Sequence, residues 1–159
     1  MILKIEGFLL TIPCLTALIY GERQGLVYVI VALACIITGT LVSLKKPANY
    51  VIYLKEGCIS TALSWILMGM AGAVPFVLTG EIPTYTDALF ETVSGFTTTG
   101  ASILNDIEAL SRCSLMWRSF THWIGGMGVL VFLIAIITMS GGSNINLMRA
   151  ESPGPSVGK

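Results

Sequence analysis

The chain has 159 residues, of which 54% are hydrophobic and 11% are charged, and its formal net charge is zero. A soluble domain carries about 25% charged residues, so the composition indicates an integral membrane protein whose surroundings are the lipid bilayer. The balanced charge gives no indication of a nucleic-acid partner. The four cysteines are scattered and show no CxxC spacing, so we interpret them as small buried residues rather than metal ligands.

Four apolar segments are expected to form transmembrane helices because a span needs about 20 apolar residues. They cover about residues 5–20, 26–44, 57–79 and 115–139. The first also resembles a signal peptide in length. Glu6 near its start, and the lack of a convincing cleavage pattern before Gly21, favour a retained helix.

The charges between these segments predict the orientation in the membrane. The segment that follows the second helix carries Lys45, Lys46 and Lys55, whereas the loop over 80–110 is acidic. Short Lys-rich loops are usually cytoplasmic. We therefore expect a multi-pass protein with both termini in the cytoplasm, which agrees with basic residues near each end, namely Lys4, Arg149 and Lys159.

A short helix is expected within the acidic loop. Thr84 and Asp87 have the spacing of a capping box with Thr84 as the N-cap, and a mostly apolar run follows as far as Phe96. Roughly 12 residues of helix reach about 18 Å, which is near half a membrane. Such a helix must enter the bilayer and stop, and its C-terminal end, which carries partial negative charge, favours a nearby cation.

The polar loop after this short helix is the candidate ion-binding segment, Thr97, Thr98, Thr99, Gly100 and Ala101. Exposed backbone at membrane depth is tolerated where it faces protein or a water-filled path. Carbonyl oxygens in a selectivity filter replace the hydration shell of an ion. The alternative is an ordinary extracellular loop, but the preceding half-length helix favours a pore.

The fourth apolar segment carries Arg118 and His122 near its start, four residues apart and on one face. An arginine in a spanning segment usually has a partner, and Glu91, Asp87 and Asp106 are the candidates. The alternative for Arg118 is an extended side chain that reaches the membrane interface. A proton relay through His122 is a less favoured possibility.

Three glycines follow on the same segment, Gly125, Gly126 and Gly128. Small residues let helices approach closely in membranes. We expect these glycines to pack against the short helix near the pore rather than to contact a ligand.

Three sequence motifs resemble one known family. Residues 91–102, ETVSGFTTTGAS, resemble the first pore loop of the Trk/Ktr/HKT superfamily of potassium transporters. Residues 117–128, WRSFTHWIGGMG, and residues 151–155, ESPGP, resemble the following helix and loop in TrkH-type members. The motifs occur in the expected order and spacing, and the resemblance extends over most of the chain.

The resemblance implies an all-α membrane protein with four transmembrane helices, one re-entrant pore helix and a filter loop. In the family, four helix–pore-loop–helix repeats surround one pore. Residues 1–48 would be an additional helix pair, 49–140 the first repeat and 141–159 a truncated cytoplasmic connection. Gly100 matches the key filter glycine, and K⁺ would bind at Thr98, Thr99 and Gly100.

The resemblance further implies the partners and the cell location. The three remaining repeats would complete the pore, and the full subunit would form a homodimer with a cytosolic nucleotide-binding regulatory subunit. The location would be the bacterial inner membrane. No cofactor is expected besides the transported K⁺, and coupling to H⁺ or Na⁺ remains open.

The predicted function is thus potassium uptake across the inner membrane, without enzymatic chemistry. Because a single repeat does not surround an ion, the chain is expected to be a fragment. One alternative is a subunit of an unrelated homotetrameric pore-loop channel. Another is a membrane scaffold or enzyme without transport, although the chain offers no catalytic cluster. The choice between K⁺ and Na⁺ is left open by the sequence.

Overall fold

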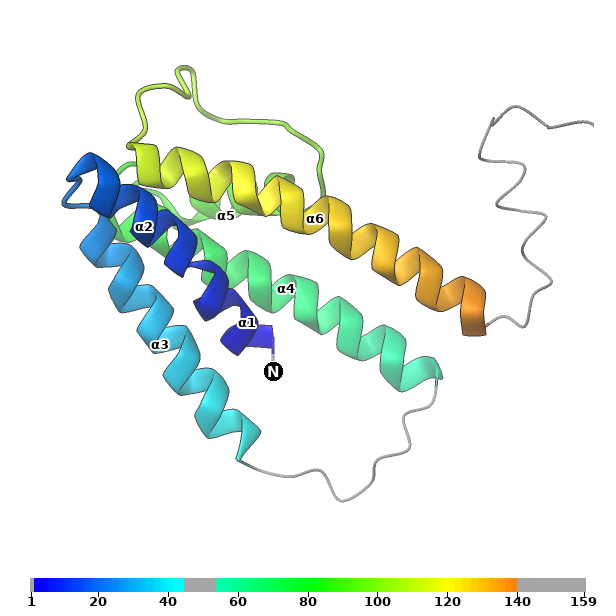
Figure 1. The fold of residues 1–159 in the computed structure, drawn as a ribbon. Helices are drawn as coiled ribbons and strands as arrows, with labels where there is room; N and C mark the ends of the chain where they lie inside the picture. The colour runs from blue at the N-terminus through cyan, green and yellow to red at the C-terminus, as the bar shows by residue number, and fades with distance from the viewer. Residues whose placement is uncertain (1, 45–53, 140–159) are drawn as a thin grey trace, which may run out of the picture. The chain divides into compact units, whose positions relative to one another are not determined.

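The computed structural model of the chain describes residues 2–44 and 54–139, and these ranges contain helices and no strands. This confirms the prediction of an all-α protein. The helices are α1 (Ile2–Leu9), α2 (Thr11–Tyr20), α3 (Gly25–Ser43), α4 (Leu54–Leu78), α5 (Tyr85–Phe96) and α6 (Arg112–Met139), as Figure 1 shows. The expectations for the Lys45–Lys46 loop and for the 141–159 tail lie outside the described residues.

The chain divides into two compact units, residues 1–125 and 126–159. The first unit contains α1 to α5 and the N-terminal half of α6. The described part of the second unit continues α6 to Met139.

Three helical stretches in the described residues are long and apolar enough to cross a membrane. They are 2–20, which combines α1 and α2, then α3, and residues 59–78 of α4. The backbone of α6 is helical over 28 residues, which corresponds to about 42 Å. The chain is therefore a multi-pass membrane protein.

The first span differs from the single uninterrupted helix that its sequence predicts. The helical assignment is interrupted at Leu10, although the Leu10 amide still donates to the Glu6 carbonyl over 2.9 Å. Pro13 follows, and a proline cannot donate to the carbonyl four residues earlier, here that of Leu9. The interruption is consequently local, and α2 continues the path of α1 (Figure 1).

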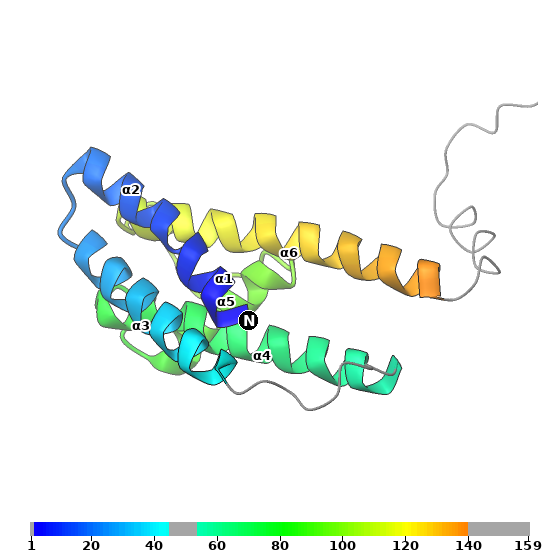
Figure 2. The same cartoon turned by 60° about the horizontal axis from the view of Figure 1, so that its bottom comes forward.

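The first span and α3 form an antiparallel hairpin, which is visible from two directions in Figures 1 and 2. Small residues bring the two helices together. A Cβ on Gly7 would lie 2.8 Å from the Ala32 carbonyl oxygen, and a Cβ on Gly25 would lie 2.4 Å from the Ala17 Cβ. Neither position has room for a side chain, so glycine sets the helix separation.

Helix α5 lies against α4 and has the bounds that the sequence predicts, with Thr84 as N-cap and Phe96 as the last residue. The expected capping box is wrong in one respect, because Thr84 makes no side-chain hydrogen bond to the helix. Its carbonyl accepts from the Ala88 amide instead, over 3.0 Å. Asp87 in the first turn still complements the helix dipole.

Candidate functional site

The loop after α5 begins by folding its amides back onto the last turn of the helix. The Thr97 amide donates to the Val93 carbonyl over 2.8 Å, the Thr98 amide to the Gly95 carbonyl over 2.9 Å, and the Thr99 amide to the Ser94 carbonyl over 3.0 Å. These bonds satisfy carbonyls that a helix end leaves without partners.

Two residues of this loop have left-handed backbone angles. Thr98 has φ 55° and Gly100 has φ 76°. A positive φ is unusual for a β-branched residue such as threonine, and strained backbone of this kind concentrates at functional sites. Glycine adopts the same region freely, which gives Gly100 a conformational role in the loop.

Short polar contacts hold the loop in place, although its residues are exposed. The Thr97 and Thr99 hydroxyls lie 2.8 Å apart, the Thr98 hydroxyl donates to the Thr97 carbonyl over 2.7 Å, and the Ser94 hydroxyl donates to the Ala101 carbonyl over 2.6 Å. All five residues from 97 to 101 are exposed on this chain. The loop is therefore fixed from the side of α5 and free on its other side.

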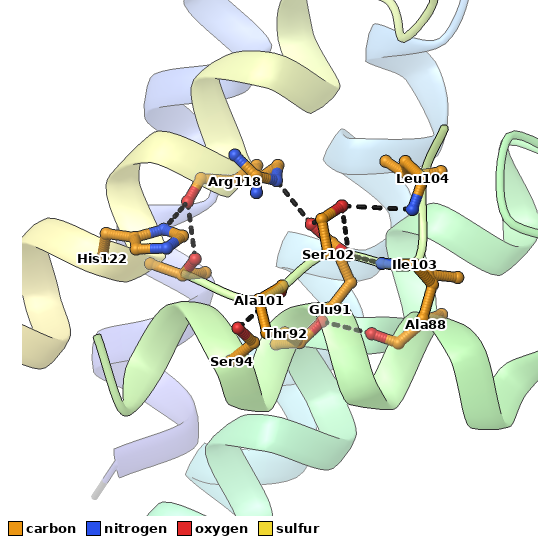
Figure 3. Close-up of polar contacts among 11 residues, drawn as sticks. Ala88, Glu91, Thr92, Ser94, Ala101, Ser102, Ile103, Leu104, Arg118 and His122 are labelled. Carbon is orange, nitrogen blue, oxygen red and sulfur yellow. Dashed lines mark hydrogen bonds and ion pairs between the residues drawn. The ribbon is translucent and has the colours of Figure 1, made fainter. Parts of the chain in front are cut away.

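Glu91 joins three segments around this loop, as Figure 3 shows. Its carboxylate accepts from the Ser102 hydroxyl at 3.0 and 3.1 Å, from the Ile103 amide at 3.2 Å and from Arg118 Nε at 2.5 Å. The Glu91 side chain is 1% exposed. Charge-assisted bonds from several donors make such burial possible, so Glu91 ties α5 to both the returning chain and α6.

The ion pair identifies the partner of Arg118. Of the three acids proposed from the sequence, Glu91 is the one that pairs with it, whereas Asp87 and Asp106 do not. His122 lies one turn further along α6, and its Nδ1 is 2.9 Å from the Arg118 carbonyl oxygen. The structure thus gives His122 a local contact on its own helix.

Close backbone approaches hold α6 against the end of α5. A Cβ on Gly125 would lie 2.1 Å from the Phe96 carbonyl oxygen, and a Cβ on Gly95 would lie 2.1 Å from the Thr121 hydroxyl oxygen. Gly125 therefore packs closely against the last residue of the short helix. Gly126 and Gly128 belong to the second unit, and their expected packing stays a prediction.

The N-terminus of α6 is capped by acids from other parts of the chain. Glu22 accepts from the Arg112 and Cys113 amides over 2.8 and 3.0 Å, and Glu81 accepts from the Ser111 amide over 2.7 Å. Partial desolvation raises the pKa of Glu22, but these amide hydrogen bonds and the charge of Arg112 outweigh it and leave the pKa below its ordinary value. The cap therefore favours an ionised Glu22.

Several of these contacts were not predicted from the sequence. Ser94 and Glu22 meet their partners only after folding, since Glu22 and Arg112 are 90 residues apart. The Ser94 hydroxyl could have been suspected, because serine near a helix end commonly bonds local backbone. No comparable local signal indicates the Glu22 cap.

The chemistry available at the loop is that of neutral oxygens. Within the described residues no group of three or more histidine, cysteine or acidic side chains could hold a metal ion. The exposed residues 97–101 instead offer hydroxyl and carbonyl oxygens. Oxygens of this type suit a hard cation that binds weakly enough to move on.

Comparisons with known proteins place this geometry in a family. A family model for TrkH, described as a cation transport protein, matches residues 25–159. The Trk system potassium uptake protein TrkH of Halomonas elongata is 35% identical over 98% of this chain, and that of Escherichia coli K12 is 36% identical over 91%. An uncharacterized cation transporter of Methanocaldococcus jannaschii is 35% identical over 88%.

The crystal structure of the potassium transporter TrkH from Vibrio parahaemolyticus has the same fold over most of the chain. It matches with a TM-score of 0.78 and 30% identity, covering 85% of this chain and 29% of that one. The chain likewise spans only 29–34% of the three relatives named above. By its match to the family model and by these likenesses, the chain belongs to the TrkH family of cation transport proteins.

Proposed function

We propose that this chain supplies the first pore loop of a potassium uptake subunit, with residues Thr97 to Ala101 facing the ion path. The observation that carries this proposal is the exposed loop with left-handed backbone at Thr98 and Gly100, anchored from behind by Glu91 and Ser94. The relatives named for potassium uptake give the ion. K⁺ would bind at Thr98, Thr99 and Gly100.

The mechanism in this proposal is binding and passage without covalent chemistry. Backbone and hydroxyl oxygens replace part of the hydration shell of K⁺, and no side chain needs to change its protonation state. The partial negative charge at the C-terminal end of α5 favours a cation at the loop. The rigid ties behind the loop hold the oxygens in place, which reduces the cost of organising them around each ion.

A single loop supplies only part of a coordination shell, so the proposed assembly needs further partners. Three more repeats of the same kind would complete the ring, and the subunit would work as a homodimer with a cytosolic nucleotide-binding regulator. In the open loop, backbone polar groups would face lipid if nothing covered them. We therefore infer that the exposed side of residues 97–101 is covered by other pore loops.

Complementation of a bacterial strain that lacks potassium uptake tests the proposed function. Residues 1–159 alone should insert into the membrane but not restore growth at low potassium, whereas a protein extended by three further repeats should restore it. Growth with residues 1–159 alone would contradict the proposal and favour a self-assembled ring of identical subunits. Failure of the extended protein, despite normal insertion, would contradict potassium uptake itself.

The proposed orientation in the bacterial inner membrane places both termini and the 45–56 segment in the cytoplasm. In a cysteine-free background, a cysteine in place of Asn49 should resist an impermeant thiol reagent in intact cells. A cysteine in place of Asn105 should react. The reverse labelling pattern would overturn the orientation.

A further inference from the structure

Glu6, in the first span, is a buried acid that the proposed ion path does not use. Its side chain is 1% exposed, and neither carboxyl oxygen has a hydrogen-bond partner in the part of the chain that the structure describes. Other buried polar side chains nearby are satisfied, such as Thr92, whose hydroxyl donates to the Ala88 carbonyl over 2.8 Å. A buried polar group without a partner calls for a specific explanation.

The Glu6 carboxyl packs at Gly72 of α4, together with two apolar groups of α5. A Cβ placed on Gly72 of α4 would lie 3.1 Å from Glu6 Oε1, 3.0 Å from the Thr92 methyl carbon and 3.3 Å from the Phe96 ring. The Trp117 indole donates to the Gly72 carbonyl over 2.9 Å. The carboxyl therefore lies where α1 meets α4, near the last turns of α5, which is the helix that leads into the candidate loop.

The charged and titratable groups around this place do not supply a counter-charge. On α3, the Cys35 thiol is close enough to interact electrostatically with Glu6, but it carries no positive charge. Lys4 lies two positions from Glu6 on α1 and therefore on another face, and its stem packs at Gly39. On α2, Cys14 contacts the Leu10 carbonyl. On α5, Glu91 is paired with Arg118.

An ionised carboxylate at this position would be very unfavourable. The free energy needed to move an isolated charge into an apolar interior far exceeds the stabilisation from an ordinary side-chain contact. Such a carboxylate takes up a proton instead. A bound metal ion would need several oxygen ligands, but a methyl group and an aromatic ring face the site. Further repeats would not supply a partner, because the carboxyl is already covered by this chain.

We propose that Glu6 is a proton-binding site at the junction of α1, α4 and α5, where the neutral carboxylic acid lets the first span pack behind the pore helix. The bound proton is taken from water and is returned to it when the junction opens. Loss of the proton within the closed junction would leave an unpaired charge and force α1 away from α4. The site does not depend on which ion the whole protein carries.

Infrared spectroscopy of the full-length protein in lipid at neutral pH tests this directly. The difference spectrum between the wild type and Glu6→Gln should lose a carbonyl stretching band of a protonated carboxylic acid and should keep the carboxylate bands. Loss of a carboxylate band instead would show an ionised Glu6 and overturn the proposal. Removal of the acid band by added K⁺ or Na⁺ would identify a cation site and would also overturn it.

The pH dependence of thermal unfolding gives a second readout. The unfolded chain releases the Glu6 proton at a lower pH than the closed junction does. Relative to Glu6→Gln, wild-type stability should therefore fall as the pH rises from the acidic range, and the difference should level off once the closed junction has also released the proton. Glu22→Gln is the matched control, because Glu22 is a hydrogen-bonded acid in a loop and its removal should leave the alkaline behaviour of the wild type intact. Parallel stability curves for the wild type and Glu6→Gln over the whole range from acidic to alkaline pH would contradict the proposal.

A second substitution allows the same test if Glu6→Gln is poorly expressed. Glu6→Met replaces the acid by an uncharged chain of similar length and gives the same spectral subtraction. At least one of the two variants should fold, because the proposal holds that the junction requires a neutral group. Misfolding of both would contradict it.

Discussion

Glu6 and Glu91 are both 1% exposed, yet the fold surrounds the two carboxyl groups in opposite ways. Glu91 receives hydrogen bonds from a hydroxyl, an amide and a guanidinium. Glu6 lies beside a glycine, a methyl group and an aromatic ring, without a hydrogen-bond partner among the described residues. A buried charge is tolerated when it is paired and bonded, so burial alone does not determine what an acid does.

The two acids also lie at different sides of α5. Glu91 connects α5 to the returning chain and to α6, where Ser102 and Arg118 supply donors. Glu6 reaches the region of Thr92 and Phe96 from α1. Helix α5 is consequently held on one side by the ion pair and hydrogen bonds of Glu91. On the other side it is held by packing that includes no paired charge.

The largest loss of stability is expected when the ion pair between Arg118 and Glu91 is removed. Arg118→Ala would leave the Glu91 carboxylate buried without its counter-charge, which costs about 3–5 kcal/mol of unfolding free energy. Arg118→Lys should restore only part of this, because lysine lacks the planar donor fork. Folded yield in detergent and thermal unfolding measure both variants.

The matched control for this prediction lies on the same helix. The Arg112 side chain is exposed, and its backbone amide, which contacts Glu22, is retained in Arg112→Ala. That variant should remain close to the wild type. If Arg118→Ala were as stable as Arg112→Ala, the ion pair between Arg118 and Glu91 would not be needed to hold the loop. The proposed difference between Glu91 and Glu6 would then be contradicted.

A smaller loss is expected from filling the contact between α6 and α5. The Cβ of Gly125→Ala would overlap the Phe96 carbonyl oxygen, and overpacking of this kind costs about 1–3 kcal/mol. Gly57→Ala is the control, because a Cβ there meets nothing within 4 Å. Equal melting temperatures for the two variants would show that the backbone approach at Gly125 is not needed.

The smallest effect concerns pH and Glu22. Its folded pKa lies below the ordinary value of 4.5. The cap therefore contributes its full stability above the unfolded pKa and loses it as the pH falls through the folded pKa. Glu22→Gln should remove this component of the acid sensitivity. An unchanged acid profile would show that the cap adds no measurable stability. The stability linked to Glu6 is expected to change in the opposite direction, because it falls as the pH rises.

The lengths of the apolar segments predicted most of the fold, because a backbone in lipid must form its hydrogen bonds within the protein. A spanning segment must satisfy its own amides and carbonyls, so it forms a helix, and α3, α4 and α6 follow the predicted segments to within a few residues. The interruption at Leu10 was missed although Pro13 was present in the sequence as a signal. The Thr84 cap was correctly placed, but its side-chain bond depends on local geometry that spacing does not determine.

The candidate site was only partly predictable for a similar reason. The Thr97–Ala101 segment was recognisable from its composition and its place after a short helix, and its role in ion binding stays a prediction. The sequence named three possible partners for Arg118, and the fold selects Glu91. For the Ser94–Ala101 bond, the only local signal is a serine near a helix end. The Glu22 cap needs the chain to return on itself, and no local pattern indicates it.

The loop that holds Gly100 is proposed to line the ion path, so a change in this loop should change ion selectivity. Gly100 and Gly80 have φ values of 76° and 77°, and a Cβ on either meets nothing within 4 Å in this chain. Serine at either position therefore introduces the same backbone strain, and only Gly100 lies in the candidate loop.

Uptake of K⁺ and Na⁺ by the full-length protein should be measured for Gly100→Ser and Gly80→Ser, with membrane insertion as the reference. We expect Gly100→Ser to lower the preference for K⁺ by about tenfold, which corresponds to ~1.4 kcal/mol, and Gly80→Ser to keep it. Unchanged selectivity in Gly100→Ser, or an equal loss in both variants, would contradict the assignment of this loop to the ion path.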